Sequence, residues 1–350
     1  MAVDLSKLVS KRRLEFEELR GKSVAIDAYN MLYQFLSIIR QSDGTALMDA
    51  KGNVTSHLSG IFYRTIDMVG YGIRPIYVFD GIPSMLKQKT TMSRIKRRDE
   101  ARKAWEEAKE SGDVEAMRMR AMASTRITKD VVDSAKELLA LMGIGCINAP
   151  SEGEAQASYM SGKGLVYAAA SQDYDTMLFG SRYVVRNLTF SGRRKLPGKN
   201  VYINVEPEIV SLEDTLRALG VSRRQLIWMG MMLGTDFNGG IRGVGPKTAL
   251  KIAKGASSIE DINSAVKEKY RQEFEPGIRE VEDLFLNPEV RELDGDAVQR
   301  LLGMPYDIDG IVRFMCDEHG FSKDRISKTA ERLSKTKAES RQKGMDQYFG

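Results

Sequence analysis

Ile76-Tyr77-Val78-Phe79-Asp80 is a short apolar run that ends in an acidic residue. The same pattern occurs at Val24-Ala25-Ile26-Asp27, and the run Val166-Tyr167-Ala168-Ala169-Ala170-Ser171 leads into Asp173. Apolar runs of this length, bounded by turn residues, are typical of buried parallel strands, and ligands of open α/β sheets bind beyond the carboxyl ends of such strands. The sequence therefore predicts an α/β fold with a central, mostly parallel sheet flanked by helices, in which three strands bring carboxylates to one edge.

Acidic residues at two further places join these strand ends. Two open a predicted helix after Pro150, and one lies in the turn that begins at Gly234. Two like charges about 4 Å apart repel by roughly 4 kcal/mol at an effective dielectric constant near 20, so such a cluster persists only if it is protonated or neutralised by cations. Because Mg²⁺ prefers oxygen ligands, the pattern predicts a metal site. The candidate ligands are Asp27, Asp80, Glu152, Glu154, Asp173, Asp175 and Asp236.

Each of these residues also has a purely structural interpretation. Asp27 or Asp80 alone could be a turn residue at a strand end, and Ser151 with Glu154 three residues later fits a capping box. The metal hypothesis depends on the convergence of all five places. The chain has only two histidines and two cysteines, which gives little support to a zinc site or a Cys–His nucleophile.

The composition is that of a globular protein with an anionic partner. Of the 350 residues, 42% are apolar and 29% are charged, and the net charge is +5 with a pI near 9.0. No stretch reaches the roughly 18 uninterrupted apolar residues of a membrane span, and the N-terminus lacks the apolar region of a signal peptide, so we expect a cytoplasmic protein.

Residues 87–103 contain eight Lys or Arg and two acidic residues. This run indicates either an anion-binding surface or a solvated helical face.

Patterns along the chain indicate five regions. Strand and helix alternate at first, a polar, Met-rich and helical stretch suited to an arch or lid follows, and the α/β pattern then returns. From residue 205 onward the pattern is helical, and the chain ends in a charged tail that we expect to be mobile. The predicted regions are 1–98, 99–130, 131–258, 259–335 and 336–350, with 1–335 as one compact unit.

Gly243-Val244-Gly245-Pro246-Lys247 is a glycine-rich turn that leads into a predicted helix. A helix with Pro in its first turn presents free backbone N–H groups to a phosphate. Residues 240–248 also resemble the nucleotide-binding pattern G-x-x-x-x-G-K-[ST], but Pro246 separates Gly245 from Lys247 and the preceding element is helical, so we reject an ATP site. A phosphate-binding turn and a plain connection between helices both remain open.

Taken together, these motifs resemble the flap endonucleases, the structure-specific nucleases that trim 5′ flaps, and the archaeal members in particular. The resemblance covers nearly the whole chain. It implies nuclease regions at 1–98 and 131–258, the second with a helix–hairpin–helix element, a helical arch at 99–130, a C-terminal helical region at 259–335 and a clamp-binding tail at 336–350. The markers are Val-Ala-Ile-Asp27-Ala, Tyr-Val-Phe-Asp80-Gly, Ser-Glu152-Gly-Glu154-Ala, Ser-Gln-Asp173-Tyr-Asp175, Gly234-Thr-Asp236 and Ile-Arg-Gly-Val-Gly-Pro-Lys247.

The resemblance implies a Mg²⁺-dependent 5′ flap endonuclease with 5′→3′ exonuclease activity, acting on DNA in Okazaki fragment maturation and base excision repair. Two Mg²⁺ ions, for which Mn²⁺ can substitute, would bind the seven carboxylates: the first Asp27, Asp80, Glu152 and Glu154, the second Asp173, Asp175 and Asp236. Lys87 and Arg94 match arch residues that contact the scissile phosphate, and Tyr33 matches an aromatic residue that stacks on a base. K⁺ is expected beside a DNA phosphate at the helix–hairpin–helix. The implied DNA contacts are Tyr33, Arg40, Arg64, Lys87, Arg94, Arg97, Arg98, Glu152, Gly234, Asp236, Gly243, Gly245 and Lys247.

The C-terminus matches a pattern that binds sliding clamps, Gln-x-x-aliphatic-x-x-aromatic-aromatic. Its positions are Gln342, Met345, Tyr348 and Phe349, and a frayed end with chance aromatics is the alternative. The expected partners are branched or flap DNA and a sliding clamp (PCNA), with no membrane, for a chain that is a monomer by itself. The competing functions are a non-catalytic DNA-junction scaffold recruited by a clamp and a related nuclease that prefers RNA or bubble junctions. Ala2 departs from the family, which usually has Gly there.

Overall fold

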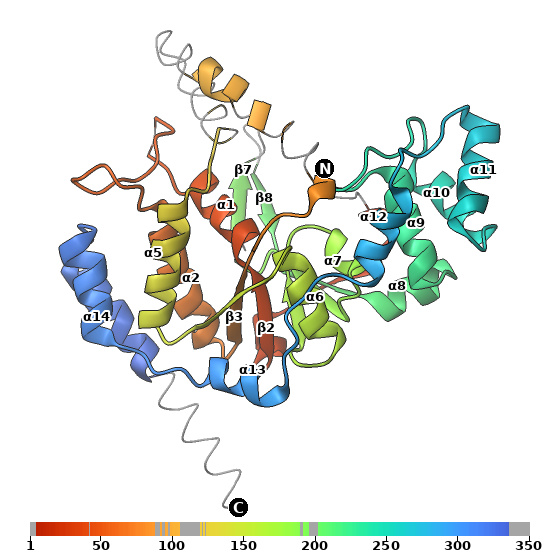
Figure 1. Ribbon diagram of the computed structural model, residues 1–350. Coiled ribbons are helices and arrows are strands. Elements are labelled where there is room, and N and C mark those ends of the chain that lie inside the picture. The colour runs from red at the N-terminus through yellow and green to blue at the C-terminus, as the bar shows by residue number, and fades with distance from the viewer. Residues whose placement is uncertain are drawn as a thin grey trace, which may run out of the picture.

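A seven-stranded sheet forms the centre of the molecule, with helices on both of its faces (Figure 1). The computed structural model describes residues 5–41, 43–87, 92, 95–96, 99–105, 120, 122, 124–189, 192–195 and 202–335. Among them the strand order is β1-β9-β6-β5-β2-β3-β4, and β7 and β8 pair separately. The strands are β1 (Lys11–Arg13), β2 (Ser23–Asp27), β3 (Arg74–Phe79), β4 (Gly145–Asn148), β5 (Ala168–Ala170), β6 (Tyr183–Arg186), β7 (Gly192–Lys195), β8 (Tyr202–Val205) and β9 (Glu208–Ser211).

The middle of the sheet is parallel, as the sequence predicts. Strand β2 pairs with both β3 and β5, so that Val24 lies opposite Pro75 on one side and Ala168 on the other. Strands β4 and β6 extend the parallel arrangement outward. Because these strands run the same way, the residues that follow them emerge at one edge, and this edge carries the predicted carboxylates.

Helices cover both faces of the sheet, which explains why its strands are apolar at successive positions. Alternate residues Val24 and Ile26 join a core shared with α1, α2 and α5. Ala25 between them joins a smaller core with α6 and α13. The α-helices are α1 (Ala28–Ile38), α2 (Ser56–Gly70), α5 (Lys129–Leu141), α6 (Gly153–Gly162), α7 (Asp175–Leu178), α8 (Leu212–Leu219), α9 (Arg223–Leu233), α10 (Pro246–Lys254), α11 (Ile259–Tyr270), α12 (Ile278–Leu286), α13 (Gly295–Leu302) and α14 (Ile308–Val312).

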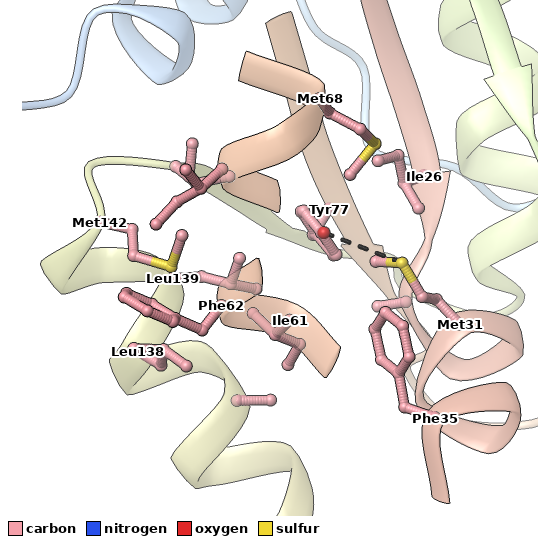
Figure 2. Close-up of a cluster of buried hydrophobic side chains, with 14 of the residues drawn as sticks. Ile26, Met31, Phe35, Ile61, Phe62, Met68, Tyr77, Leu138, Leu139 and Met142 are labelled. Carbon is pink, nitrogen blue, oxygen red and sulfur yellow. Dashed lines mark hydrogen bonds between the residues drawn. The ribbon is translucent and has the colours of Figure 1, made fainter. Parts of the chain in front are cut away.

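The core on the α1 side fixes the strand that ends beside Asp80. Figure 2 shows Tyr77 of β3 between Met31 and Phe35 of α1 and the apolar residues of α2 and α5. The buried Tyr77 hydroxyl pairs with the hydroxyl of Thr65 at 2.6 Å and donates to Met31 Sδ at 3.8 Å. A large aromatic residue with a satisfied hydroxyl therefore holds β3 against two helices, three positions before Asp80.

A third core lies among α9, α10, α11 and α12, on the opposite side of the molecule from α5 (Figure 1). Its largest buried side chain, Trp228, donates from Nε1 to the buried carboxylate of Glu282 at 2.6 Å, and Arg224 Nε donates to the same oxygen at 2.7 Å. This network fixes α12 against α9, the helix that leads directly to Asp236.

The three predicted strands that lead to acidic residues and the predicted helices after Pro150 and Gly245 are confirmed, but the prediction of helix alone from residue 205 onward is wrong. Strand β9 pairs antiparallel with β6 on one side and with β1 on the other. It is only four residues long, and its buried Ile209 and Val210 suit a strand between two neighbours. None of the described helices is long and apolar enough to cross a membrane. The predicted division into five regions stays a prediction, and its last region, 336–350, lies outside the described residues.

Candidate metal and nucleic-acid site

Two of the predicted carboxylates stand at the ends of neighbouring strands. Asp27 ends β2 and is the N-cap of α1, where it accepts a hydrogen bond from the backbone N–H of Asn30 at 2.9 Å. Asp80 follows β3 and accepts from the backbone N–H of Gly153 at 2.7 Å. A Cβ atom at position 153 would lie 2.7 Å from Asp80 Oδ1. Glycine at the start of α6 therefore permits the close approach of Asp80.

The start of α6 adds two glutamates to these aspartates. Glu152 is the buried N-cap of this helix but makes no capping hydrogen bond, so the capping-box interpretation through Ser151 is wrong. Glu154 in the first turn accepts from Ser171 Oγ at 2.7 Å, and the same hydroxyl lies 3.5 Å from Asp27 Oδ2. One serine hydroxyl thus joins the ends of β5, β2 and α6.

Asp173 and Asp175 come from the short loop between β5 and α7. The side chain of Asn30 on α1 donates from Nδ2 to Asp173 Oδ2 at 3.4 Å, which brings the loop to the end of β2. Asp175 is the first residue of α7, and only 2% of it is exposed. Three different strand ends therefore supply carboxylates, as the sequence predicts.

Asp236 reaches the cluster from a tight turn after α9. Gly234 ends this helix with φ 95°, a backbone conformation that favours glycine. The returning backbone passes so close that a Cβ on Gly240 would lie 2.6 Å from the nitrogen of Gly234. Thr235 Oγ1 donates to Asn238 Oδ1 at 2.8 Å and closes the turn. These contacts fix the direction of the chain at Asp236.

Lys87 lies among the carboxylates. It ends the short 3-10 helix η2 (Met85–Lys87), and its ammonium group forms an ion pair with Glu152 and lies 3.8 Å from Asp236 Oδ2. The ring of Phe237 is 5.7 Å from the same nitrogen. Burial alone would lower the pKa of Lys87, but attraction by Glu152, Asp80 and Asp236 outweighs it and raises the pKa. Lys87 is therefore a charged internal partner of the cluster.

One lysine does not neutralise the whole cluster. Burial raises the pKa of Asp27 to about 8, and repulsion by Asp80 adds to this shift. Burial also raises the pKa of Asp80 to about 6, against the attraction of Lys87. The pKa of Glu154 is raised well above its usual value by burial first and then by repulsion from Asp173. These shifts arise because several carboxylates are buried together and repel one another.

The donor chemistry fits hard divalent cations, since the predicted ligands are all carboxylates. In the part of the chain that is described, however, no three His, Cys, Asp or Glu side chains are already arranged around one metal position. Lys87 pairs with two of the predicted ligands, Glu152 and Asp236. Metal binding would therefore require these side chains to exchange the ammonium group for the metal.

The predicted DNA contacts fall into different surroundings. Tyr33 on α1 is 38% exposed and available for stacking, whereas Arg64 on α2 is half-buried. The guanidinium of Arg40 donates to the carbonyl of Gly44 at 2.8 Å and to Thr125 Oγ1 at 2.7 Å, so in this structure it joins the end of α1 to the segment before α5.

The glycine-rich turn has the predicted form. Gly243 has φ 88°, Gly245 is the N-cap of α10, Pro246 stands at the helix start, and Lys247 is exposed. The turn therefore presents free N–H groups and a lysine at the same helix N-terminus.

Several predicted positions lie outside the described residues: Ala2, Arg94, Arg97, Arg98, Gln342, Met345, Tyr348 and Phe349.

Sequence reasoning missed two residues that contact the predicted ligands and one that contacts Lys87. Asn30 binds both Asp27 and Asp173, Ser171 binds Glu154, and Phe237 lies against Lys87. Asn30 could have been found, because it is the third residue after a strand-end aspartate that begins a helix. No local sequence pattern identifies Ser171 or Phe237 as a residue of the site.

Comparison with known proteins identifies the family. The XPG N-terminal domain family matches residues 1–101, and the XPG I-region family matches residues 143–236. The chain is 48% identical over 351 residues to flap endonuclease 1 of Thermococcus onnurineus, covering 100% of this chain and 99% of the relative. The chain belongs to the flap endonuclease 1 family. The Pyrococcus abyssi member is 45% identical, covering 100% and 98% of the two chains.

Solved structures agree with this family. Flap endonuclease-1 from Methanococcus jannaschii superposes with a TM-score of 0.73 at 35% identity, covering 97% of this chain and 99% of that one. The catalytic core of Rad2 in complex with DNA substrate shares the fold, with a TM-score of 0.69 at 24% identity, covering 95% and 100% of the two chains. This chain is thus a structure-specific, DNA-binding nuclease of a metal-dependent family, a hydrolase of phosphodiester bonds.

Proposed function

We propose that the carboxylate cluster is the catalytic centre of a 5′ flap endonuclease and 5′→3′ exonuclease that uses two Mg²⁺ ions, with Mn²⁺ as a substitute. Asp27, Asp80, Glu152 and Glu154 would hold the first ion. Asp173, Asp175 and Asp236 would hold the second. Two bound metals clamp the attacking and leaving oxygens of a phosphodiester displacement. The observation that carries this proposal is the convergence of carboxylates from three strand ends and the start of α6, joined through hydrogen bonds to Asn30, Gly153 and Ser171.

The neighbouring residues orient the carboxylates. The backbone N–H of Asn30 holds one carboxylate oxygen of Asp27, and the backbone N–H of Gly153 holds one carboxylate oxygen of Asp80, so both side chains are fixed in direction. The Ser171 hydroxyl does the same for Glu154. Ligands held in this way need less reorganisation when a cation or a phosphate arrives.

Lys87 has two roles in the proposal. Without metal its ammonium group neutralises Glu152 and Asp236. With cations bound to these carboxylates, the ammonium group of Lys87 would be free to contact the scissile phosphate and would stabilise charge that develops in the transition state. Arg94 belongs with it in the proposal, as a second cation from the same arch.

Duplex DNA is proposed to extend from the cluster in two directions. Tyr33 provides a stacking face, a contact worth about 1–3 kcal/mol per base, and Arg40 and Arg64 lie on the same side of the sheet through α1 and α2. Arg97 and Arg98, together with Gly234, Glu152 and Asp236 at the site, complete this set. On the other side, the N-terminus of α10, with Gly243, Gly245 and Lys247, is proposed to hold a phosphate, with K⁺ beside it.

The proposed assembly is a monomer that binds flap DNA and a sliding clamp in the cytoplasm. Gln342, Met345, Tyr348 and Phe349 would dock on the clamp, because one helical turn places the three apolar side chains on one face. Tethering raises the concentration of the nuclease at junctions without changing the site itself.

Substitution of the proposed ligands tests the site. Asp80→Ala and Asp175→Ala should each abolish cleavage of a labelled double-flap duplex in Mg²⁺ yet bind the duplex with nearly unchanged affinity in EDTA, since phosphate contacts dominate binding. Asp67→Ala is the matched control, because Asp67 is an acid on α2 that pairs with Arg332 at 3.3 Å, away from the cluster. Near-normal turnover by either ligand variant would remove the proposal.

The same assay separates the competing functions. A wild-type chain that binds the double flap but never cuts it would be a junction scaffold. Faster cleavage of an RNA flap or a bubble than of a DNA flap of equal length would indicate the related nuclease.

A further inference from the structure

Arg186 stands beside the loop that carries Asp173 and Asp175. It is the last residue of β6, the parallel neighbour of β5, and the register that pairs Ala170 with Val185 places it next to the start of this loop. Only 18% of its side chain is exposed. Arg186 is therefore a largely buried arginine at the same sheet edge as the acidic cluster, and its contacts there indicate its role.

The guanidinium group contacts the loop at two positions. Arg186 Nε donates a hydrogen bond to the backbone carbonyl of Gln172 at 3.2 Å. Its Nη1 donates to the Tyr174 hydroxyl at 2.5 Å, and the guanidinium carbon lies 4.3 Å from the centre of the Tyr174 ring. These contacts fall on the residues immediately before and after Asp173, and Tyr174 immediately precedes Asp175.

The same guanidinium group is also anchored to β9. Nη1 lies 3.4 Å from Glu208 Oε2 on β9, which also forms an ion pair with Lys11 of β1 at 3.7 Å. The chain then turns away at Asn187, whose φ of 59° is unusual for a residue other than glycine and whose side chain donates to the carbonyl of Glu206 at 3.1 Å. The guanidinium is thus fixed by the antiparallel half of the sheet and reaches across to the parallel half.

We propose that Arg186 is a positioning residue for metal binding: its planar fork holds the 171–175 loop so that Asp173 and Asp175 face a common cation. The inference rests on the proposed metal site. The planar guanidinium group is essential because it can donate to a carbonyl and to a hydroxyl and lie against a ring face at the same time, whereas an ammonium group acts as a point charge. Loss of such supporting contacts typically weakens metal binding about 10- to 100-fold.

The test measures metal binding without DNA. Mn²⁺ is titrated into the full-length, metal-free protein by calorimetry, with thermal unfolding as a check that each variant is folded. Arg186→Met should raise the Kd of Mn²⁺ at least about 10-fold. Arg186→Lys should do the same although it keeps the charge. In single-turnover cleavage, both variants should need more Mg²⁺ for half-maximal rate and approach the wild-type rate at saturating Mg²⁺.

Two further variants sharpen the test. Tyr174→Phe removes the hydrogen bond that Arg186 donates to the hydroxyl and keeps the ring, so it should raise the Kd by about 5-fold, and it carries the test if Arg186→Met does not fold. Arg182→Met is the matched control, since Arg182 is exposed at the other end of β6 and lies against Tyr183, with 5.3 Å from its guanidinium carbon to the ring centre. Its Kd should stay at the wild-type value.

Unchanged Mn²⁺ affinity in folded Arg186→Met, or in Tyr174→Phe if the former does not fold, would overturn the inference. Wild-type affinity in Arg186→Lys would also overturn it, because charge alone would then suffice. Asp175→Asn separates this failure from failure of the metal site. If that variant binds Mn²⁺ like the wild type, the metal site is wrong; if it loses Mn²⁺ while the Arg186 variants do not, only the positioning role is wrong.

Discussion

Replacing Lys87 with methionine should destabilise the metal-free protein and leave the Mg²⁺-bound protein less affected. Methionine keeps most of the length and apolar contact of the side chain, including its approach to Phe237, and removes the charge. The variant therefore isolates the ammonium group that lies between Glu152 and Asp236. If Mg²⁺ takes over these carboxylates, the charge matters for stability only when metal is absent.

The distances set the size of the effect. Unit charges 3.8 Å apart, as Lys87 Nζ and Asp236 Oδ2 are, attract by about 4 kcal/mol at an effective dielectric constant near 20. Contact with Glu152 adds a second attraction, and burial of the ammonium offsets part of the sum. Removal of one partner from a buried ion pair typically destabilises by about 3–5 kcal/mol. We expect a loss of about that size in EDTA.

Urea unfolding measures the stability of the metal-free protein in EDTA and of the metal-bound protein in saturating Mg²⁺. Mg²⁺ should stabilise Lys87→Met more than the wild type, because in the wild type the metal must first displace the ammonium. Lys136→Met is the matched control: the Lys136 ammonium also lies over an aromatic ring, 4.8 Å from the centre of Phe79, and this variant should lose far less. A loss below about 1 kcal/mol in EDTA, or an equal loss with and without Mg²⁺, would refute the reasoning.

Three further predictions concern pH, the arch and the tail. Burial, reinforced by His319, lowers the pKa of His57 from 6.5 to about 3, so below pH 6.5 the unfolded state binds a proton that the folded state does not. The unfolding free energy should therefore fall by about 1.4 kcal/mol more between pH 7.5 and 5.5 in the wild type than in His57→Gln, as measured by urea titration, and equal pH dependence would contradict this. Arg94→Ala should lower the single-turnover rate at saturating enzyme more than it weakens DNA binding; a loss confined to salt-sensitive binding would assign Arg94 to a solvated basic face instead. Deletion of residues 342–350 should leave cleavage of free flap DNA nearly unchanged and remove stimulation by the cognate clamp, and calorimetry that shows undiminished clamp binding would rule out the tail as the docking segment.

The strand-end acids were predictable because their signals are local. Asp27 and Asp80 each follow a short apolar run, and a parallel sheet brings such positions to one edge whatever the length of chain between them. The turn at Gly243–Gly245 was equally accessible, since glycine and Pro246 report backbone conformation directly. Where the local backbone conformation dictates the residue type, the sequence alone is sufficient to predict that conformation.

The contacts of Lys87, Ser171 and Arg186 were not predictable because their partners are distant in sequence. Lys87 contacts Glu152, 65 residues away, and nothing in the basic run around it separates a lysine that enters the cluster from one that faces solvent. The same applies to β9, whose four residues form a strand only because β1 and β6 lie on either side. In each of these cases the deciding partner is a residue or strand distant in sequence, which local patterns do not reveal.

The position of Asp27 and Asp80 at the carboxyl ends of β2 and β3 has a consequence for folding kinetics. Residues 27, 80 and 154 are far apart in an unfolded chain, and their side chains meet only after β2 has paired with β3 and β5 and after α6 has docked. Their mutual repulsion is therefore a property of the assembled molecule alone. A cation that relieves it acts after the sheet has formed, and it lengthens the lifetime of the native state by slowing unfolding, while the rate of folding stays nearly the same.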